Sequence, residues 1–458
     1  MTNDPRGAVR ALAFLCLLCA CLAARAAIPI QHWVQPSGAK IYFAASPSIP
    51  IVDVRVDFDA GGRREPGDMA GLANITADMT AKGIAAHGSE PELDENQLGE
   101  AWADLGAGLE ESATSDRMSF SLRTLAYPDI LPKAVALAAR QLGQPSFPDE
   151  VWQRERQRLA ASVREANTRP GVVAGKAYAA SVYGKHPYGH EVTEESLARI
   201  NVADMKRHYQ MLEPCRAKVS IVGALTREQA DGLATALLSR LPAAVSGKCD
   251  ALPAVPDVPP LEASSLKSIP FASAQAHVLM GQPGYKRNDP DHFPLIVGNY
   301  ILGGGGLVSR LAIEVREKRG LSYSAGSSFS PGLSAGAFTV SLQTRPDQAQ
   351  QALQVARDVV SRFIASGPTP VELKAAKDYL VGGYPLLIDS NRKLLDNIAN
   401  IAWYDLPLDY LDTWTAQVQR VTAADVKSAF GRKLHPDRMV TVTVGAPAAP
   451  AAPAGAAR

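Results

Sequence analysis

Apolar and polar residues alternate in short stretches of the first half of the chain. Within Ile51–Phe58, apolar residues surround Asp53, Arg55 and Asp57 at every second position. Successive side chains of a strand point to opposite faces, so this alternation predicts a strand with one buried face. The elements predicted here are strands Lys40–Phe43 and Ile51–Phe58, helix Gly71–Lys82, strand Arg117–Leu122, helices Tyr127–Leu142, Asp149–Asn167 and Ala203–Tyr209, and strand Ala217–Val222.

The second half of the chain shows a similar order of elements. Its predicted elements are strand Ala276–Met280, helix Pro294–Leu302, strand Ala337–Leu342, helices Asp347–Ser366, Thr369–Leu387 and Ala423–Phe430, and strand Met439–Val444. Strands that are separated by pairs of helices indicate α+β domains.

Three short segments of the first half recur in the second half, at spacings of 220, 221 and 222 residues. The matching pairs are Ser121–Thr124 with Ser341–Thr344, Ile200–Met205 with Val421–Val426, and Ile221–Ala224 with Thr443–Ala446. Because unrelated peptides recur in the same order and at nearly the same spacing, the sequence predicts an internal repeat.

The repeat predicts two homologous domains, each a mixed, mostly antiparallel β-sheet flanked by helices. We place the N-terminal domain at residues 27–248 and the C-terminal domain at residues 267–446. Residues 249–266 begin with a proline-rich run and are predicted to form an extended linker. Residues 447–458 are almost all alanine, proline and glycine, a composition typical of a disordered tail.

The first 26 residues have the pattern of a signal peptide. Arg6 and Arg10 precede the apolar run Ala11–Leu22, and Ala24-Arg25-Ala26 fits a small-x-small cleavage site. The pattern predicts a periplasmic or secreted protein. A retained membrane anchor and a lipoprotein modified at Cys21 are the alternatives, but the run is short for a membrane span.

Length, charge and cysteine content narrow the picture further. A chain of 458 residues is longer than one hydrophobic core usually serves, which agrees with two domains. The formal net charge of +1 and the absence of a basic stripe argue against nucleic-acid binding. Cys215 and Cys249 are the cysteines that remain after the predicted signal peptide. In an oxidising compartment they could form one disulfide, but sequence leaves two free thiols equally open.

Several motifs carry a resemblance to a known family. They are Tyr183–Gly189, which reads Tyr-Gly-Lys-His-Pro-Tyr-Gly, then Thr193–Leu197, Asn299–Leu311 and Val315–Ser324. Together with the two-copy layout, they resemble the insulinase/pitrilysin family of zinc peptidases, in the branch of the mitochondrial processing peptidase and its bacterial relatives. The resemblance covers nearly all of the chain after residue 26. It implies a two-domain peptidase fold whose members hydrolyse peptides that enter a chamber.

The zinc motif of that family is missing from this chain. An inverted zincin has His-x-x-Glu-His, whereas the resemblance places Asn74, Ala77 and Asp78 in those three positions. It places Ser162 at the third ligand, a glutamate in the family, with Glu155 as an alternative. Zinc prefers imidazole, thiolate and carboxylate ligands, and a pair of carboxylates suits a hard cation better. We therefore expect no zinc and no other cofactor on this chain.

One catalytic element of the family is still present. Arg316 and Tyr323 lie seven residues apart, which matches an Arg/Tyr pair that active members direct at the zinc site. A guanidinium and a phenol can donate hydrogen bonds to a substrate carbonyl and its developing oxyanion. The structural alternative is that Arg316 forms a surface ion pair with Glu314 or Glu317, while Tyr323 packs in a strand.

The four glycines before Leu307 need a separate interpretation. Gly303, Gly304, Gly305 and Gly306 lack the Gly-Lys-Ser/Thr ending of a phosphate loop and the spacing of a dinucleotide site. The resemblance implies a flexible loop that contacts peptide substrate, and glycine permits such close approach of the backbone. His186 and His190 flank Pro187 and Gly189 and are predicted to belong to a turn rather than to a metal site.

Two functions remain as hypotheses. In the first, the chain is the non-metal-binding subunit of a two-chain zinc metallopeptidase. A related chain supplies the zinc motif, and this chain contributes substrate binding and transition-state stabilisation for peptide or unfolded polypeptide. In the second, the chain is an inactive peptide-binding or scaffold protein of the same fold. The sequence does not distinguish a homodimer from a heterodimer, and it contains no other convincing catalytic set.

Overall fold

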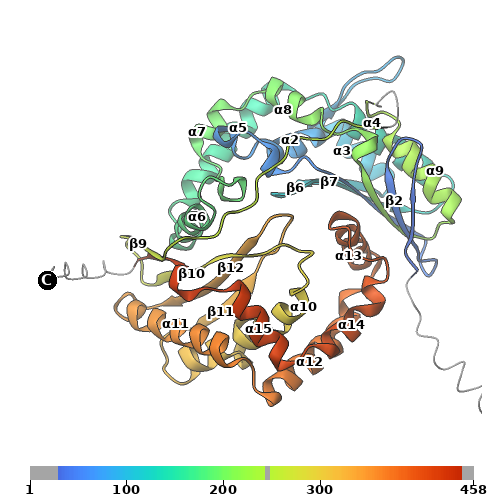
Figure 1. The fold of residues 1–458 in the computed structure, drawn as a ribbon. Helices are drawn as coiled ribbons and strands as arrows, with labels where there is room; N and C mark the ends of the chain where they lie inside the picture. Colours follow the sequence, from blue (N-terminus) through green and yellow to red (C-terminus); the bar gives the residue numbers. More distant parts are fainter. Residues whose placement is uncertain (1–28, 243–247, 446–458) are drawn as a thin grey trace, which may run out of the picture.

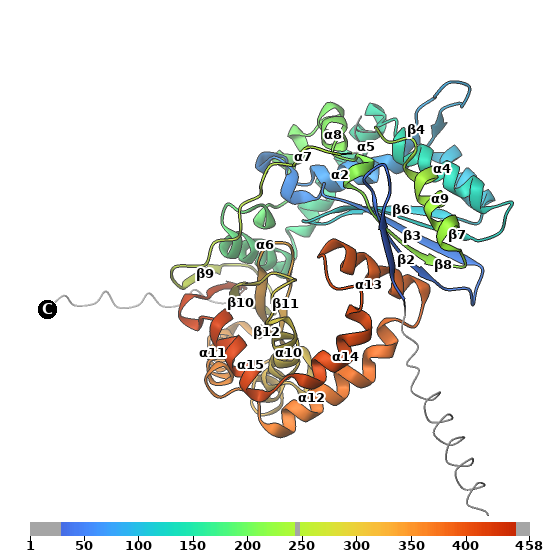
Figure 2. The ribbon, with the colours of Figure 1, turned by 45° about the vertical axis from the view of Figure 1, so that its right-hand side comes forward.

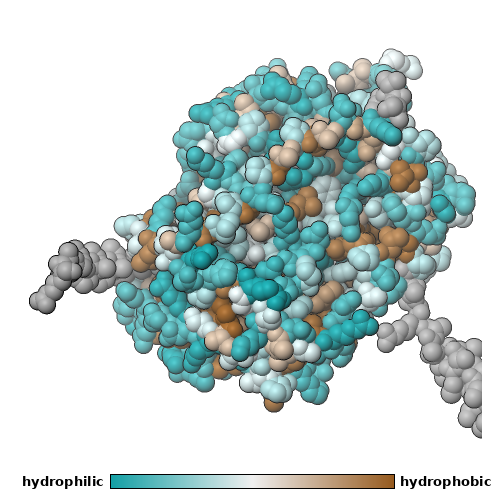
Figure 3. Space-filling model, in the orientation of Figure 1, coloured by the Kyte–Doolittle hydropathy of each residue, from teal (hydrophilic) through white to brown (hydrophobic). Residues whose placement is uncertain are grey.

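The computed structural model describes residues 29–242 and 248–445 (Figure 1). The predicted signal peptide, residues 1–26, and the predicted tail, residues 447–458, lie outside the described residues. Within the described ranges, no helix combines the length and the apolar character needed to cross a membrane. On the face shown in Figure 3, hydrophilic residues dominate and hydrophobic residues form small separate groups.

The first half of the chain is built on a six-stranded sheet. Its strand order is β1 (Gln31–Val34), β2 (Lys40–Ala45), β8 (Lys218–Gly223), β3 (Ile51–Phe58), β7 (Met118–Leu125) and β6 (Gly108–Ala113). All neighbouring strands are antiparallel except β2 and β8. The alternation in β3 has the predicted effect, because Val52, Val54, Val56 and Phe58 are buried in the core that α4 (Leu131–Gly143) and α9 (Arg227–Leu238) cover.

The second half contains a five-stranded sheet with the same arrangement. Its order is β11 (Ser324–Phe329), β12 (Gly336–Thr344), β10 (Ala276–Tyr285), β13 (Val440–Val444) and β9 (Ser265–Ile269). One pair is again parallel, here the outermost pair β13 and β9, and the other pairs are antiparallel. Read from β11 to β9, the five strands correspond in order to β6, β7, β3, β8 and β2 of the first sheet. The predicted α+β class, with two mixed and mostly antiparallel sheets, is therefore confirmed.

Helices and two short strands complete the fold. The remaining elements are α2 (Leu72–Met79), β4 (Gly83–Ile84), β5 (Leu93–Asp94), α3 (Glu95–Asp104), α5 (Asp149–Ala166), α6 (Pro170–Tyr183), α7 (Glu194–Arg199), α8 (Val202–Tyr209), α10 (His292–Asn299), the π-helices η6 (Tyr300–Gly304) and η8 (Ala312–Glu317), α11 (Ala349–Ser366), α12 (Pro370–Gly383), α13 (Asn391–Trp403), α14 (Tyr410–Arg420) and α15 (Ala423–Lys433). The predicted helix Thr369–Leu387 is shorter than expected, because a 3₁₀ turn at Tyr384–Leu387 follows Gly383.

Each half of the chain contributes one helix to the sheet of the other half. Helix α6, from the first half, packs against β10 and β13, where Tyr178 and Val182 contact the apolar residues of β13. Helix α13, from the second half, packs against β8 and β3, where Leu395 and Ile398 share a cluster with Tyr42 and Val222. Figure 2 shows α13 lying against the first sheet. This exchange of helices joins the two halves through buried apolar surface.

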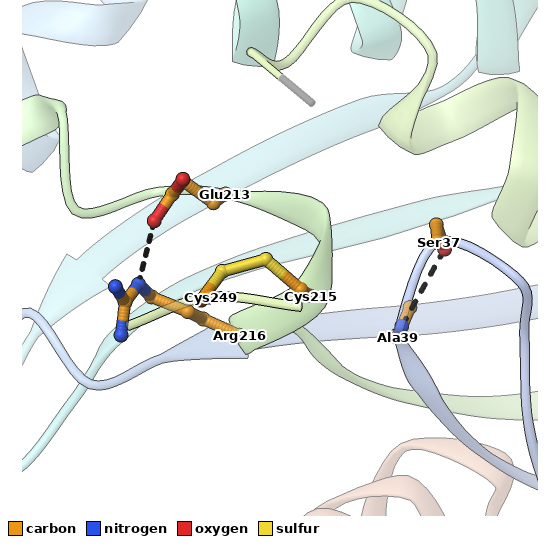
Figure 4. The surroundings of a disulfide bond; sticks show 6 residues. All are labelled: Ser37, Ala39, Glu213, Cys215, Arg216 and Cys249. Atoms are coloured by element: carbon orange, nitrogen blue, oxygen red, sulfur yellow. Dashed lines mark hydrogen bonds and ion pairs between the residues drawn. A yellow bond between two sulfur atoms is a disulfide. The ribbon is translucent and has the colours of Figure 1, made fainter. Parts of the chain in front are cut away.

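The segment between the halves has no helix or strand from residue 248 to residue 264, where β9 follows, and it is anchored to the first half. Cys215 and Cys249 form a disulfide that fastens the start of the linker to the first half (Figure 4). Further along, the His186 ring lies 3.0 Å from the Pro256 carbonyl oxygen, and Val258 is buried. The disulfide resolves the alternative that the sequence left open for the two cysteines.

Candidate functional site

Helix α2 carries the three positions of the missing zinc motif. Its N-cap residue is Gly71, whose φ of +99° favours glycine. The Glu65 carboxylate accepts hydrogen bonds from the N–H groups of Gly71 and Ala73, both at 2.9 Å, at the N-terminus of the helix. Asn74 and Asp78 are exposed on one face of the helix, four residues apart. Ala77 has no exposed surface and belongs to the core.

A cavity of about 190 Å³ lies beside this face of α2. Three carboxylates from different elements line it, namely Asp78 of α2, Glu111 of β6 and Glu155 of α5. The other lining residues are the cations Lys82 and Arg158 and the apolar Ile75, Met79, Trp152 and Leu159. Ser162 is exposed and is not among these residues. Of the two candidates for the third ligand position, Glu155 lines the cavity together with Asp78, and Ser162 does not.

Among the three carboxylates of this cavity, Glu155 has a cation partner, whereas burial raises the pKa of Asp78 despite the nearby charges of Lys82 and Arg158. Burial alone would raise the pKa of Glu155, but Arg158, which donates to it at 2.7 Å, together with Lys82 and Arg154 lowers this pKa overall. Burial, followed by the charge of Asp78, raises the pKa of Glu111 to about 7. A carboxyl group with this pKa is partly protonated near neutral pH. Sequence analysis did not identify Glu111, because β6 has no clear alternation of apolar and polar residues. The two adjacent carboxylates, Glu110 and Glu111, were the signal that could have pointed to it.

The residues present do not fit a zinc ion. Neither histidine nor cysteine lines the cavity at α2, and the position of the general base is the buried Ala77. Elsewhere in residues 29–242 and 248–445, one trio of acidic, histidine or cysteine side chains brings its ligand atoms close together: Glu213, Cys215 and Cys249. Both sulfur atoms of that trio belong to the disulfide and are unavailable as thiolates. His186 and His190 flank the 3₁₀ turn Pro187–Gly189, in agreement with the predicted turn.

Arg316 and Tyr323 lie together at an edge of the second half. Helix η8 is followed by Gly320, whose φ of +60° turns the chain, and Leu321 is buried behind the turn. The Ser322 hydroxyl lies 2.6 Å from the carbonyl oxygens of both Ser324 and Gln343, which holds the chain at the start of β11. Tyr323 is 79% exposed, and its ring centroid lies 4.7 Å from the Arg316 guanidinium carbon.

The structural alternative for this pair does not hold. Within the described residues, Glu314 pairs with Lys318 and Arg319, each at 2.7 Å, and no ion pair joins Arg316 to Glu314 or Glu317. A guanidinium stacked on an aromatic ring keeps its N–H groups available for other acceptors. The Tyr323 side chain projects from the surface instead of packing in the sheet. Both side chains are therefore free to donate hydrogen bonds to a ligand.

The four glycines lie beside this pair and are needed for packing. Helix η6, which contains Gly303 and Gly304, contacts β11. A side chain at Gly303 would come within 2.3 Å of the Ser327 nitrogen, and one at Gly305 within 2.7 Å of the Tyr300 oxygen. Gly306 has a φ of +61° and open space around it. The exposed Leu307 and Val308 follow it, so this segment presents apolar side chains as well as backbone.

The two sets of candidate residues lie in different halves of the molecule. Figures 1 and 2 both show α2 and α5 in the upper half, and β10, β11 and β12 in the lower half. The glycines and the Arg316/Tyr323 pair thus lie together, and none of them is among the residues that line the cavity at Asp78. Within this chain, Arg316 does not complete a site at α2.

A larger cavity, of about 480 Å³, lies on the face of the first sheet that α13 covers in part. Its floor is polar, because Asp53 and Arg55 of β3 and Arg123 of β7 point to the face opposite the apolar core. Its wall includes Arg392 and Asp396 of α13. The sequence did not identify this cavity, because its residues come from three strands, the segment before β6 and a helix of the other half.

Comparisons with known proteins agree with this picture. The family model "Insulinase (Peptidase family M16)" matches residues 40–195, and the model "Peptidase M16 inactive domain" matches residues 199–380. An uncharacterized zinc protease of Streptomyces coelicolor is 24% identical over 413 residues, which are 87% of this chain and 86% of that protein. The non-peptidase homologue YmxG of Helicobacter pylori is 23% identical over 387 residues, covering 82% and 85% of the two chains.

Among solved structures, a peptidase M16 inactive domain from Pseudomonas fluorescens is 31% identical, with a TM-score of 0.84 and coverage of 92% of this chain and 99% of that chain. The structure of a Helicobacter pylori protease has a TM-score of 0.82 at 17% identity, covering 91% and 99%, which shows a shared fold. The family models together span most of the described residues. The chain belongs to the insulinase family, peptidase family M16, and it is a member that lacks the family's zinc site.

Proposed function

We propose that this chain is the non-metal-binding subunit of a two-chain zinc metallopeptidase. The observation that carries the proposal is that the Arg316/Tyr323 pair is accessible at the surface and has no acidic partner. Both side chains are unpaired with acids and stand at the surface, although the chain's own zinc positions have lost their chemistry. A donor pair that faces outward and has no metal nearby suits a site completed by a second chain.

In this arrangement the chemistry is divided between the two chains. The partner is a related chain with the full zinc motif, and it supplies metal-assisted activation of water. This chain supplies Arg316 and Tyr323 as donors to the substrate carbonyl, where negative charge develops in the transition state. The adjacent segment from Gly303 to Val308 contacts the peptide, through backbone at Gly306 and through the exposed Leu307 and Val308. The substrate class is peptide or unfolded polypeptide.

The proposed compartment is the periplasm or the exterior. The disulfide between Cys215 and Cys249 supports it, because such bonds persist in oxidising environments. The pattern of residues 1–26 supports it as well.

The competing function is an inactive peptide-binding or scaffold protein. The Helicobacter pylori relative that is called a non-peptidase homologue favours it. The two functions differ in their dependence on a partner.

The test is to purify the chain from its native source under non-reducing conditions and to identify the proteins that co-elute. Zinc content and hydrolysis of an unstructured peptide are then measured on the complex, on each chain alone, and on the recombined pair. We expect a co-eluting relative with His-x-x-Glu-His, and activity that requires both chains. A chain that elutes alone, binds peptide and never supports hydrolysis would instead establish the clamp or scaffold.

A further inference from the structure

The cavity of about 480 Å³ on the first sheet contains a buried carboxylate with unused hydrogen-bonding capacity. Asp53 is 3% exposed, and its Oδ1 atom accepts a hydrogen bond from Arg123 at 3.0 Å. Its Oδ2 atom is buried and has no hydrogen-bond partner. A buried carboxylate oxygen without a donor is costly, so such a group is either neutralised or awaits a ligand.

Several of the other charged groups of this cavity are paired, and burial raises the pKa of Glu111, which also lines it, to about 7. Arg55 donates to Asp57 and Asp396, both at 3.1 Å, and Arg392 donates to Glu110 at 2.6 Å. Among the acidic groups of the cavity, Asp53 is the one that is almost fully buried and still has a carboxylate oxygen without a partner. Burial raises the pKa of Asp53, and Arg123 and Arg392 oppose this effect. A ligand that brought a positive charge to Oδ2 would stabilise the ionised carboxylate.

The arginines near Asp53 can complement a second part of the same ligand. Arg123 is about half exposed and uses one donor on Asp53, while Arg392 is more exposed and uses one donor on Glu110. An arginine has five N–H donors, so both retain donors for a carbonyl or carboxylate oxygen. Arg123 occupies Oδ1 of Asp53, so a cation at Oδ2 does not have to displace it.

The entrance to the cavity is open on the side of β6. Gly106 and Gly108 line it, and a Cβ added at either position would meet no atom within 4 Å. β6 is also the edge strand of its sheet, so one side of its backbone lies outside the ladder. A peptide could reach Asp53 over these glycines without displacing a side chain of β6.

We propose that this cavity binds a primary ammonium group of a peptide, with the ammonium at Asp53 Oδ2 and the adjacent carbonyl oxygen at Arg123 or Arg392. This inference rests on the proposed function only in taking peptide as the ligand class. The ammonium can be the peptide's N-terminus or a lysine side chain, which share one chemistry. The site belongs to the chain itself and needs no partner.

The test is a titration of the purified full-length mature chain with short peptides, followed by calorimetry. The probes are Ala-Ala-Ala-amide, its N-acetylated form, acetyl-Ala-Lys-Ala-amide and acetyl-Ala-norleucine-Ala-amide. We expect the first and third probes to bind and the second and fourth to bind at least tenfold more weakly. A preference between the first and third probes identifies the N-terminus or the lysine as the source.

Three variants assign the binding to Asp53. Asp53→Asn keeps the acceptor for Arg123 and removes the charge, so we expect affinity for the ammonium probes to fall at least tenfold. Asp291→Asn is the matched control, since Asp291 also pairs with an exposed arginine, Arg432, but lies in the second half. Arg123→Met removes one of the two proposed donors to the ligand's carbonyl oxygen and a charge that helps to keep Asp53 ionised, so we expect weaker binding. Melting temperatures establish that each variant is folded.

The inference is overturned if acetylation leaves affinity unchanged, if Asp53→Asn binds as the unaltered chain does, or if Arg123→Met tightens binding. These measurements use the chain alone and do not involve Arg316. A failure here leaves the two-chain peptidase untouched, and a failure to find a zinc-bearing partner leaves this site untouched.

Discussion

The pocket beside α2 and the Arg316/Tyr323 edge occupy different halves of one chain and have opposite properties. At α2 the geometry of a metal site is retained without its chemistry: Asn74 and Asp78 share a helix face, and Glu155 faces Asp78 across the cavity. At the edge, the donor groups themselves are retained and exposed. The comparison teaches that fold and chemistry are separable, because packing fixes the shape of a site and a few exposed side chains fix its reactivity.

The largest expected effect comes from restoring the metal ligands at α2. With Asn74→His and Asp78→His, two imidazoles and Glu155 would form a three-ligand site of the kind that binds zinc. We expect about one zinc ion per chain after dialysis, against none in the unaltered chain, by elemental analysis.

The third ligand of that restored site separates Glu155 from Ser162. Adding Glu155→Gln to the double variant should abolish zinc binding, whereas adding Ser162→Ala should not alter it. The opposite result would return the ligand position to Ser162 and contradict the cavity described here.

At the edge, Arg316→Ala should lower kcat of the two-chain enzyme by a factor of about 10² to 10³, the usual effect of removing one oxyanion donor. KM and the melting temperature should change little, because Arg316 makes no ion pair that supports the fold. Arg319→Ala is the control, since Arg319 pairs with Glu314 on the same turn. Equal losses in both variants would argue for a structural role.

The raised pKa of Glu111 predicts a pH dependence of stability in the α2 half. Its pKa in the folded chain is about 7, above the ordinary 4.5, so the folded state binds more protons between these values. The free energy of unfolding should therefore fall as pH rises from about 5 to 8, by at most about 3 kcal/mol. Urea unfolding measures this slope. Glu111→Gln should remove it, and Glu110→Gln, on the opposite face of β6, should retain it.

The smallest expected effect is that of Tyr323→Phe. The substitution keeps the ring that stacks on Arg316 and removes the hydroxyl donor, so we expect about a tenfold fall in kcat, close to the weight of a single neutral hydrogen bond. If activity is unchanged, Tyr323 serves to hold Arg316 rather than to contact substrate. A double variant with Arg316→Ala then shows whether the two residues act as a unit.

Sequence patterns predicted the parts of the fold that depend on local periodicity. The strands of both sheets that alternate, such as Ile51–Phe58, were found because one face packs on helices of the same half. Helix α6 was missed, since its many alanines and glycines form no polar face, and its packing surface lies on the other half's sheet. Helix α13 has a clear apolar stripe that could have been recognised.

The candidate site was predicted in the same uneven way. Arg316, Tyr323 and the loss of the zinc motif follow from short motifs that sequence preserves. The pairing of Glu155 with Asp78, and the presence of Glu111, depend on how α5 and β6 cross α2, which no local pattern encodes. The Asp53 cavity was beyond sequence reasoning for the same reason, as its wall comes from residues more than 300 positions away.

The exchange of helices between the halves constrains the timing of folding during synthesis. The first sheet is complete in sequence once β8 ends at Gly223, but the helix that covers its second face begins only at Asn391. A nascent chain must therefore hold an uncovered sheet while about 170 further residues are made, at rates of about 5 to 20 residues per second. The interval is on the order of 10 to 30 seconds. A fragment that ended before α13 would leave that face of the sheet uncovered. The first half therefore completes its folding only when the second half is present.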